Sequence, residues 1–314
     1  MMKKSFEERS VLSERCNSIE EAIRTYCKAS RIDDKKPISG GCISRAYRVG
    51  TDVGTFFVKV NGDEGAYEMF QSEMEGLQVM YNTKTIRVPK PICCCQSSEG
   101  ALLVLENIEM SGRVDKKIQV MLGEQIANLH QCHGDSFGFS VNNTIGSTPQ
   151  INVNRSSDWV DFFVTWRLKF QLDLLMKNHH DEEVYKEGIR LSNNVIKFFP
   201  KELIISPSFL HGDLWGGNVG VLQSDQIPVI FDPACYYGHH EAELSIMTMF
   251  GGFDSNFFES YHKKIPKFEM YFKERQQLYQ LYHYLNHYNM FGSGYRGSCV
   301  RIIQSLLKVV DNKF

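Results

Sequence analysis

The sequence predicts an α+β fold of two lobes: a small N-terminal lobe with an antiparallel sheet and one helix, and a larger, mainly helical C-terminal lobe. Two observations support this fold class. In the first third of the 314 residues, short β-type runs alternate with Gly and Pro, whereas helical spacing of apolar residues prevails further along the chain. We therefore place the lobes at 1–108, including a leading helical segment 1–30, and at 109–314, with a hinge near 106–108.

The N-terminal lobe is expected to contain strands and one helix after its leading segment. Segments 46–50 and 55–60 are short β-type runs, and the turn between them ends at Gly54. Segment 68–80 repeats apolar residues with helical spacing, and the apolar run 101–105 is typical of a buried strand.

The C-terminal lobe is expected to be built from long amphipathic helices. Segments 118–130, 158–176 and 278–291 all show the helical period, and Asp158 is a suitable N-cap for the second of them. One β-type segment, 228–234, lies between the last two of these helices.

Composition argues against several classes of protein. A net charge of −2 offers no field that would attract nucleic acid or an anionic membrane. No apolar run approaches the ~18 residues needed to span a bilayer. The nine cysteines are odd in number and no secretory signal is evident, which predicts reduced thiols and a cytoplasmic protein. Cys93, Cys94 and Cys95 lack the paired spacing of zinc ligands, so we expect them to pack as small apolar residues.

The most specific pattern is LHGDLWGGNVG, residues 210–220. Asp213 and Asn218 lie five residues apart there, and Asp232 follows at the end of an apolar segment. A loop with Asp-x4-Asn, followed by a strand ending in Asp, is typical of phosphotransferases. Asp213 would accept the proton of the acceptor hydroxyl, while Asn218 and Asp232 would hold Mg²⁺, which prefers oxygen ligands. His211 is offset from this target, and we interpret it as structural.

The N-terminal lobe would then hold ATP. Gly40 and Gly41 lie in a turn that enters a strand, where backbone N–H groups can bind phosphates. Lys59 lies between apolar residues of the next strand and would contact the phosphates, although a lysine facing water on an edge strand is an alternative. Glu73, on the following helix, is the expected carboxylate partner of Lys59. The alternatives to Glu73 are Glu68 and Glu75.

The junction of the lobes offers a place for the base of the nucleotide. Adenine needs a donor and an acceptor at its edge, and backbone groups of Glu106, Asn107 and Ile108 are suitable. A plain linker between the lobes is the alternative.

The chain resembles the fructosamine/ketosamine-3-kinases, within the protein-kinase-like aminoglycoside phosphotransferase group. The likeness runs from about residue 15 to 308 and rests on specific motifs, which are GGCIS, FFVKV, HGDLWGGNV, DPACYYGHHEAELSIMTMFGGF, YHKKIPK and LYQLYHYLNHYNMFG. The resemblance implies phosphorylation by Mg-ATP of the 3-hydroxyl of ribulosamines, psicosamines or fructosamines, on small amines or protein lysines. The phosphorylated adduct would then decompose and free the amine, which is deglycation.

The resemblance also bears on the acceptor site. An indole offers an apolar platform for a sugar, so Trp215, two residues from Asp213, would stack on the acceptor. Packing of Trp215 under its own loop is the alternative. Tyr284 and His287 could line the same pocket, as could Asn286, although core packing is an alternative for each. The stretch with His239, His240, Glu241 and Glu243 shows no good metal-ligand spacing, and the family implies that it supports the catalytic loop.

Cys42 is a separate hypothesis. It lies in the predicted phosphate loop, where nearby N–H groups would favour the thiolate. The family carries a cysteine there, which implies a redox-dependent homodimer through Cys42 as an alternative to a monomer. The other interpretation is that Cys42 is an inert small residue.

Two alternative functions apply to the whole chain. A kinase of an aminoglycoside, choline or homoserine would keep every catalytic assignment, and a non-catalytic kinase-like scaffold would lack one of them.

Overall fold

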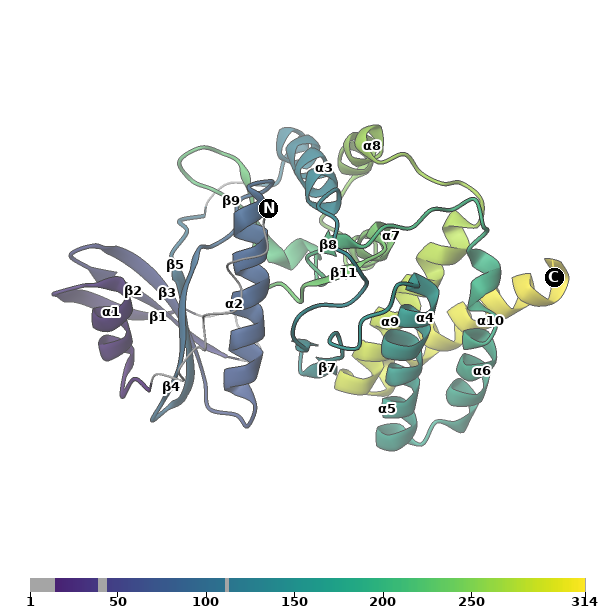
Figure 1. Cartoon of the computed structure of the whole chain (residues 1–314), viewed down its shortest axis with the longest axis horizontal. Helices are drawn as coiled ribbons and strands as arrows, with labels where there is room; N and C mark the ends of the chain where they lie inside the picture. Colours follow the sequence, from purple (N-terminus) through teal and green to yellow (C-terminus); the bar gives the residue numbers. More distant parts are fainter. Residues whose placement is uncertain (1–14, 39–43, 111–112, 314) are drawn as a thin grey trace. The chain divides into compact units, whose positions relative to one another are not determined.

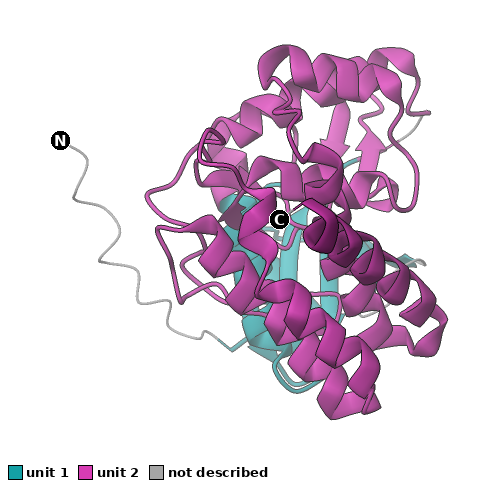
Figure 2. Cartoon of the chain, turned by 90° about the vertical axis from the view of Figure 1, so that its right-hand side faces the viewer, with its two compact units in different colours: residues 1–78, 89–108 teal, residues 79–88, 109–314 magenta. Residues whose placement is uncertain are grey.

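The computed structural model describes residues 15–38, 44–110 and 113–313 of the chain. They divide into two units, coloured separately in Figure 2: unit 1 lies within 1–78 and 89–108, and unit 2 within 79–88 and 109–314. The sequence predicts 79–88 as part of the first lobe. These residues cluster with unit 2 because Arg87 forms a parallel bridge with Val229, and its carbonyl accepts a hydrogen bond from the N–H of Ile230 at 3.0 Å.

Unit 1 is built on an antiparallel sheet of five strands in the order β1-β2-β3-β5-β4 (Figure 1). Its strands are β1 (Ile32–Ile38), β2 (Arg45–Thr51), β3 (Gly54–Asn61), β4 (Pro91–Ser97) and β5 (Gly100–Glu106). The three predicted strands are confirmed as β2, β3 and β5. The two that sequence periodicity missed are β1, which is rich in charge, and β4, which contains the cysteine triplet.

The helices of this part of the chain are α1 (Ile19–Cys27), in unit 1, and α2 (Ala66–Thr83), whose residues from 79 onward are counted in unit 2. Ser18 caps α1 by accepting a hydrogen bond from the N–H of Glu21. The buried face of α1 shares a hydrophobic cluster with Val58, Val60, Cys93 and Cys95. The buried cysteines therefore pack as small apolar residues, and burial raises the pKa of their neighbour Cys94 to about 12.

Unit 2 is mainly helical. Its helices are α3 (Lys116–His130), α4 (Trp159–Phe163), α5 (Phe170–His179), α6 (Glu182–Ser192), α7 (His240–Met247), α8 (Ser255–Lys264), α9 (Phe272–Phe291) and α10 (Arg296–Lys313). Short 3₁₀ turns occur at Val195–Phe198, Gly216–Asn218 and Ser293–Tyr295. Asp158 caps α4 as predicted, accepting from the N–H of Asp161 at 2.7 Å. The predicted helix 158–176 contains a π-helical turn, Val164–Lys169, between α4 and α5.

Unit 2 also contains three short two-stranded ladders, and two of them fix the ends of loops 211–218 and 231–235. They pair β6 (Asn143–Ile145) with β7 (Thr148–Gln150), β8 (Ser208–Leu210) with β11 (Tyr236–Gly238), and β9 (Val219–Val221) with β10 (Pro228–Ile230). Loop 211–218 connects β8 to β9, and loop 231–235 connects β10 to β11. Since β8 pairs with β11 and β9 with β10, the two loops begin and end beside each other.

The structure shows no helix, among the residues it describes, with the length and apolar character that a membrane crossing requires.

Candidate active site

In unit 1, Lys59 and Glu73 form an ion pair. Val58 and Val60 face the α1 side of β3, so the side chain of Lys59, between them, points to the opposite face of the sheet. There Lys59 Nζ lies 2.7 Å from Glu73 Oε1 of α2, with both side chains largely buried at 13% and 12% exposure. Of the three acids considered on α2, Glu73 is thus an observed partner of Lys59, whereas Glu68 is exposed.

Two backbone N–H groups at the end of β5 already have hydrogen-bond acceptors within unit 1. The N–H of Glu106 donates to the carbonyl of Lys90 at 2.9 Å, and the N–H of Asn107 donates to the carbonyl of Thr55 at 3.3 Å. The Glu106 carboxylate also accepts from the N–H of Lys90. Of the three predicted positions, Ile108 therefore remains the candidate for the donor to a base. The predicted residues Gly40, Gly41 and Cys42 lie outside the described residues.

In unit 2, loops 211–218 and 231–235 are cross-linked by hydrogen bonds. The N–H of Ala234 donates to the carbonyl of His211 at 2.8 Å, and the N–H of Phe231 donates to the carbonyl of Asn218 at 3.2 Å. The imidazole of His211 connects the same segments, since Nε2 donates to the carbonyl of Phe231 at 2.9 Å and Nδ1 accepts from the N–H of Asp213 at 3.3 Å. Burial lowers the pKa of His211, which suits this neutral, structural role.

Asp213 and Asn218 are in direct contact. The Asn218 amide nitrogen donates to the Asp213 carbonyl at 2.8 Å and lies 3.3 Å from Asp213 Oδ2. Because the nitrogen is turned toward Asp213, the amide oxygen lies on the other side of the planar group. Asn218 is buried and Asp213 half-buried. This arrangement orients a carboxylate and leaves an amide oxygen suitable for a cation.

The position of Asp232 corrects one prediction from the sequence. The strand ends at Ile230, so Asp232 lies two residues beyond it in a loop, with a left-handed φ of 57° and an exposed side chain. Non-glycine residues adopt this backbone region at a cost and hold it where surrounding contacts fix it. The hydrogen bonds of Phe231 and Ala234, on both sides of Asp232, supply such contacts.

Asp213 lies in a concentration of negative charge. Burial, the Glu243 carboxylate and the Asp232 carboxylate together raise the pKa of Asp213 to about 8, against the opposing effect of the Asn218 hydrogen bond. Like-charge repulsion of this kind is relieved when a cation binds. The donor set is therefore one that a divalent cation would stabilise.

Glu243, on α7, holds the start of loop 211–218. One carboxylate oxygen accepts from the N–H of His211 at 2.6 Å, and the other accepts from the N–H of Gly212 at 3.0 Å. His130 Nε2 lies 3.5 Å from the same carboxylate. Burial would raise the pKa of Glu243, but His130 and His211 hold it below its ordinary value. The family resemblance implies a supporting role for this stretch, and the structure identifies Glu243 as the carboxylate that makes these contacts.

Two glycines of the loop are required by close approach. Gly212 has a φ of +84°, and a Cβ there would lie 2.0 Å from the carbonyl oxygen of Ala234. Gly216 packs against Gly252, where a Cβ would meet the Gly216 Cα at 2.7 Å. The glycine-rich sequence therefore reflects tight packing of loop 211–218 against loop 231–235 and against segment 251–252.

A buried cluster of amides, which no sequence pattern indicated, fixes the segment after Asp232. The Asn143 amide donates to the carbonyl of Cys235 at 2.8 Å, and the Gln150 amide donates to the carbonyl of Ala234 at 3.1 Å. Tyr282 of α9 donates to Gln150 at 2.8 Å. Asn152 joins Asn143 to the buried Arg167 in the π-helical turn. Loop 231–235 is thus held by side chains remote from it in sequence.

The predicted acceptor residues divide into surface and core. Trp215 is 40% exposed, and its indole lies over Gly217, where a Cβ would meet the ring at 2.2 Å. Phe250 links Trp215 to His287, with ring centroids 6.1 Å and 5.1 Å apart, respectively. Tyr284 is half-buried on the same face of α9 as His287. Asn286 is in the core, bonded to Gln171 and to the carbonyl of Ile145.

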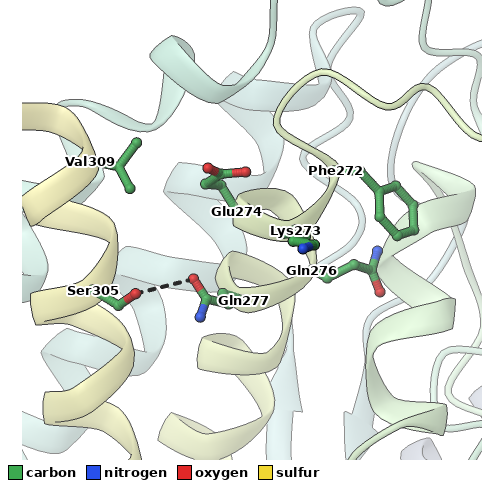
Figure 3. Close-up of a pocket in the computed structure, with 7 residues that line it drawn as sticks. All are labelled: Phe272, Lys273, Glu274, Gln276, Gln277, Ser305 and Val309. Atoms are coloured by element: carbon green, nitrogen blue, oxygen red, sulfur yellow. Dashed lines mark hydrogen bonds between the residues drawn. The ribbon is translucent and has the colours of Figure 1, made fainter. Parts of the chain in front are cut away.

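A pocket of about 450 Å³ lies elsewhere in unit 2, between α9 and α10 (Figure 3). It is lined by Phe272, Lys273, Glu274, Gln276, Gln277, Ser305 and Val309. None of these is a candidate site residue. Within the described part of the chain there is also no group of three or more His, Cys, Asp or Glu residues that could hold a metal ion.

Comparison with known proteins gives concordant results. The family model described as fructosamine kinase matches residues 16–309. A protein-ribulosamine 3-kinase of Arabidopsis thaliana, named as chloroplastic, is 43% identical over 93% of this chain and 88% of its own length. A mouse ketosamine-3-kinase is 41% identical over 86% of this chain and 93% of its own. A crystal structure of a Haemophilus somnus protein, provisionally named fructosamine-3-kinase, matches with a TM-score of 0.78 and 27% identity over 88% of this chain and 92% of that one.

Proposed function

The chain belongs to the fructosamine kinase family, and from this premise we propose that it transfers the γ-phosphate of ATP to the 3-hydroxyl of ketosamines. The observation that carries the assignment of roles is the cross-linking of loops 211–218 and 231–235, which sets Asp213 against Asn218 and fixes the backbone on both sides of Asp232. The predicted kinase-like α+β fold is confirmed by the structural match.

Asp213 is the proposed base. Its carboxylate would accept the proton of the sugar hydroxyl and orient that oxygen, as phosphoryl transfer depends mainly on positioning and charge. Without a cation its pKa is about 8, and a cation bound beside it would lower this pKa and favour the ionised form that can accept a proton. In unit 1, Lys59 is proposed to contact the phosphates of ATP, with Glu73 fixing the angle of its ammonium group.

Asn218 and Asp232 are the proposed Mg²⁺ ligands. Mg²⁺ usually takes one or two protein oxygens and completes its shell with phosphate oxygens and water, so two ligands suffice. The amide oxygen of Asn218, turned away from Asp213, and the exposed Asp232 carboxylate fit that requirement. When bound, the cation would offset charge on the phosphates of the nucleotide.

The proposed product is a ketosamine 3-phosphate. Phosphate is a better leaving group than hydroxide, so the adduct would decompose without further catalysis and release the amine. The substrates would be small ketosamines and glycated lysines of proteins. The cytoplasmic location inferred from the sequence, and a dimer through Cys42, stay predictions.

A ³²P-transfer assay tests the function directly. We expect label from ATP to appear on a ribulosamine or a fructosamine in the presence of Mg²⁺, and to be lost when EDTA is added. Aminoglycoside, choline and homoserine serve as rival acceptors in the same assay. Transfer to one of those, with none to either ketosamine, would contradict the assignment.

A further inference from the structure

The aromatic surface at Trp215 extends beyond the residues assigned to the sugar. We call Trp215, Phe250, His287, Phe291 and Tyr295 the aromatic strip. The ring centroids are 6.1 Å apart from Trp215 to Phe250, 5.1 Å from Phe250 to His287, 5.6 Å from His287 to Phe291 and 5.1 Å from His287 to Tyr295. The strip therefore forms a continuous series of contacts that starts two residues from Asp213.

The strip is unusually open for so many rings. Trp215 is 40% exposed, Phe250 43% and Phe291 62%. Helix α9 ends at Phe291, and a 3₁₀ turn follows it. The turn places the ring centroid of Tyr295 6.2 Å from that of Phe291. Contiguous exposed apolar surface is uncommon on soluble proteins and often marks a binding site.

The arginine next to the far end of the strip is ion-paired. Arg296, next to Tyr295, is paired with Asp181 at 2.7 Å and with Glu183 at 2.5 Å. Burial lowers the pKa of His287, which favours its neutral form. The far end of the strip is therefore suited to a neutral, apolar group rather than to an ion.

His287 supplies a polar position in the middle of the strip. Its Nδ1 lies 2.8 Å from the carbonyl of His283, and since a carbonyl only accepts, Nδ1 carries the hydrogen. In the neutral ring, Nε2 is then an acceptor. A ketosamine has the matching order of groups, because its sugar is joined to an amine that donates hydrogen bonds, and the amine carries a further substituent.

Resting on the proposed function, we propose that the strip binds ketosamines lengthwise: the sugar on Trp215, the amine at His287, and the amine's substituent against Phe291 and Tyr295. The strip thereby selects ketosamines whose nitrogen carries an apolar or aromatic group. Phe291 and Tyr295 are specificity-determining residues for this carrier and have no part in phosphoryl transfer itself.

Two substrates with the same sugar test this proposal. Ribulosyl-benzylamine and ribulosyl-methylamine differ only in the substituent on nitrogen. We expect the native protein to prefer the benzyl compound by about tenfold in kcat/KM, as is typical for one additional apolar group in a pocket. Phe291→Ser should bring that ratio close to one, whereas Phe291→Tyr, which keeps a ring, should preserve most of it. Tyr295→Ser provides a second variant and should also lower the ratio.

Ile204→Ser is the matched control, because Ile204 is an apolar residue of unit 2 with 88% exposure and lies outside the strip. It should leave the ratio unchanged. If neither compound is phosphorylated, the proposed function fails. If both are phosphorylated with equal kcat/KM, or if Phe291→Ser and Tyr295→Ser keep the native ratio, the carrier site fails and the function stands. Sedimentation compares self-association of the native protein and Phe291→Ser. If Phe291→Ser self-associates less but keeps the native substrate ratio, the strip is a contact between copies of the chain and the proposal is overturned.

Discussion

The candidate residues of unit 1 and unit 2 are positioned in different ways. Lys59 and Glu73 lie on a strand and a helix, and the alternation of side chains along β3 is enough to direct Lys59 toward α2. Asp213, Asn218 and Asp232 lie in or beside loops. There the backbone is fixed by hydrogen bonds that the imidazole of His211 and the buried amides donate, and by those that the carboxylate of Glu243 accepts.

This difference predicts how each unit responds to mutation. Removing one partner of the Lys59–Glu73 pair should change ligand binding and leave the sheet intact. Removing a group that holds loops 211–218 and 231–235 should change both activity and stability, because a buried donor or acceptor then loses its hydrogen-bond partner. The predictions below test this contrast, from the largest expected effect to the smallest.

Asp213→Asn should strongly slow the chemical step while keeping the fold. We expect kcat to fall by about 10³-fold, since a positioned base contributes about 10²–10⁴-fold. The Asn side chain has the same shape and keeps an oxygen toward Asn218. The measurement is ³²P transfer at saturating ATP, with circular dichroism as the control for folding. Residual kcat within tenfold of the native value would remove Asp213 from the role of base.

Lys59→Met should weaken nucleotide binding while the sheet of unit 1 still forms, with some loss of stability because the largely buried Glu73 carboxylate loses this cation. Loss of a cation that contacts phosphates is expected to raise the KM for ATP by about 10–100-fold, since charge-assisted contacts contribute roughly 1.5–3 kcal/mol. Glu73→Gln should produce a smaller change in the same direction, because the ammonium group remains. Isothermal titration with a non-hydrolysable ATP analogue measures the effect. Unchanged affinity in Lys59→Met would indicate a purely structural ion pair.

Glu243→Gln should reduce activity and stability together. The amide can accept from only one of the two backbone N–H groups of His211 and Gly212, so one buried donor loses its partner at a cost of about 1–3 kcal/mol. We expect a lower midpoint of urea unfolding and a fall in kcat of about tenfold, with an unchanged KM for ATP. A change in stability alone would show that the carboxylate does not position Asp213.

The pKa of Asp213 predicts an unusual dependence of stability on pH. The folded carboxyl titrates at about 8 instead of 3.8, so the folded state binds its proton more tightly than the unfolded chain does. The free energy of unfolding of the metal-free protein should therefore fall as pH rises from about 4 to 8. Asn does not titrate, so the stability of Asp213→Asn should not fall in this way. At pH 8 the variant should be more stable than the native protein by at least about 1 kcal/mol, since one pKa unit corresponds to about 1.4 kcal/mol. The measurement is urea unfolding of both proteins in EDTA across this pH range. If the free energy of unfolding changes with pH in the same way in both, the assignment is contradicted.

Tyr282→Phe and Tyr279→Phe form a matched pair on α9. Both hydroxyl groups are buried and hydrogen-bonded, but Tyr282 contacts Gln150, which holds Ala234, whereas Tyr279 contacts Trp159 and His239. Each variant should lose about 1 kcal/mol of stability. Only Tyr282→Phe should weaken Mn²⁺ binding in the presence of ADP, by about twofold to fivefold as measured by electron paramagnetic resonance. Equal Mn²⁺ affinity in both variants would show that the buried amides do not determine the position of Asp232.

Sequence by itself determined the elements and residues with local patterns. Helical and strand periodicity located β2, β3, α2, β5, α3 and α9, because burial of one face imposes the same period on the chain. The pairing of Lys59 with Glu73 followed from a strand and the next helix. The family motifs around Asp213 indicated the chemistry, and Asp158 marked the start of α4.

Only the tertiary structure decided which distant groups meet. No local pattern shows that Glu243 accepts from the backbone of His211, that Asn143 and Gln150 hold the segment after Asp232, or that Phe250 joins Trp215 to His287. The end of the strand at Ile230 and the left-handed backbone of Asp232 likewise depend on these partners. Hydrogen bonds between irregular segments have no period along the chain, so folding alone brings them together.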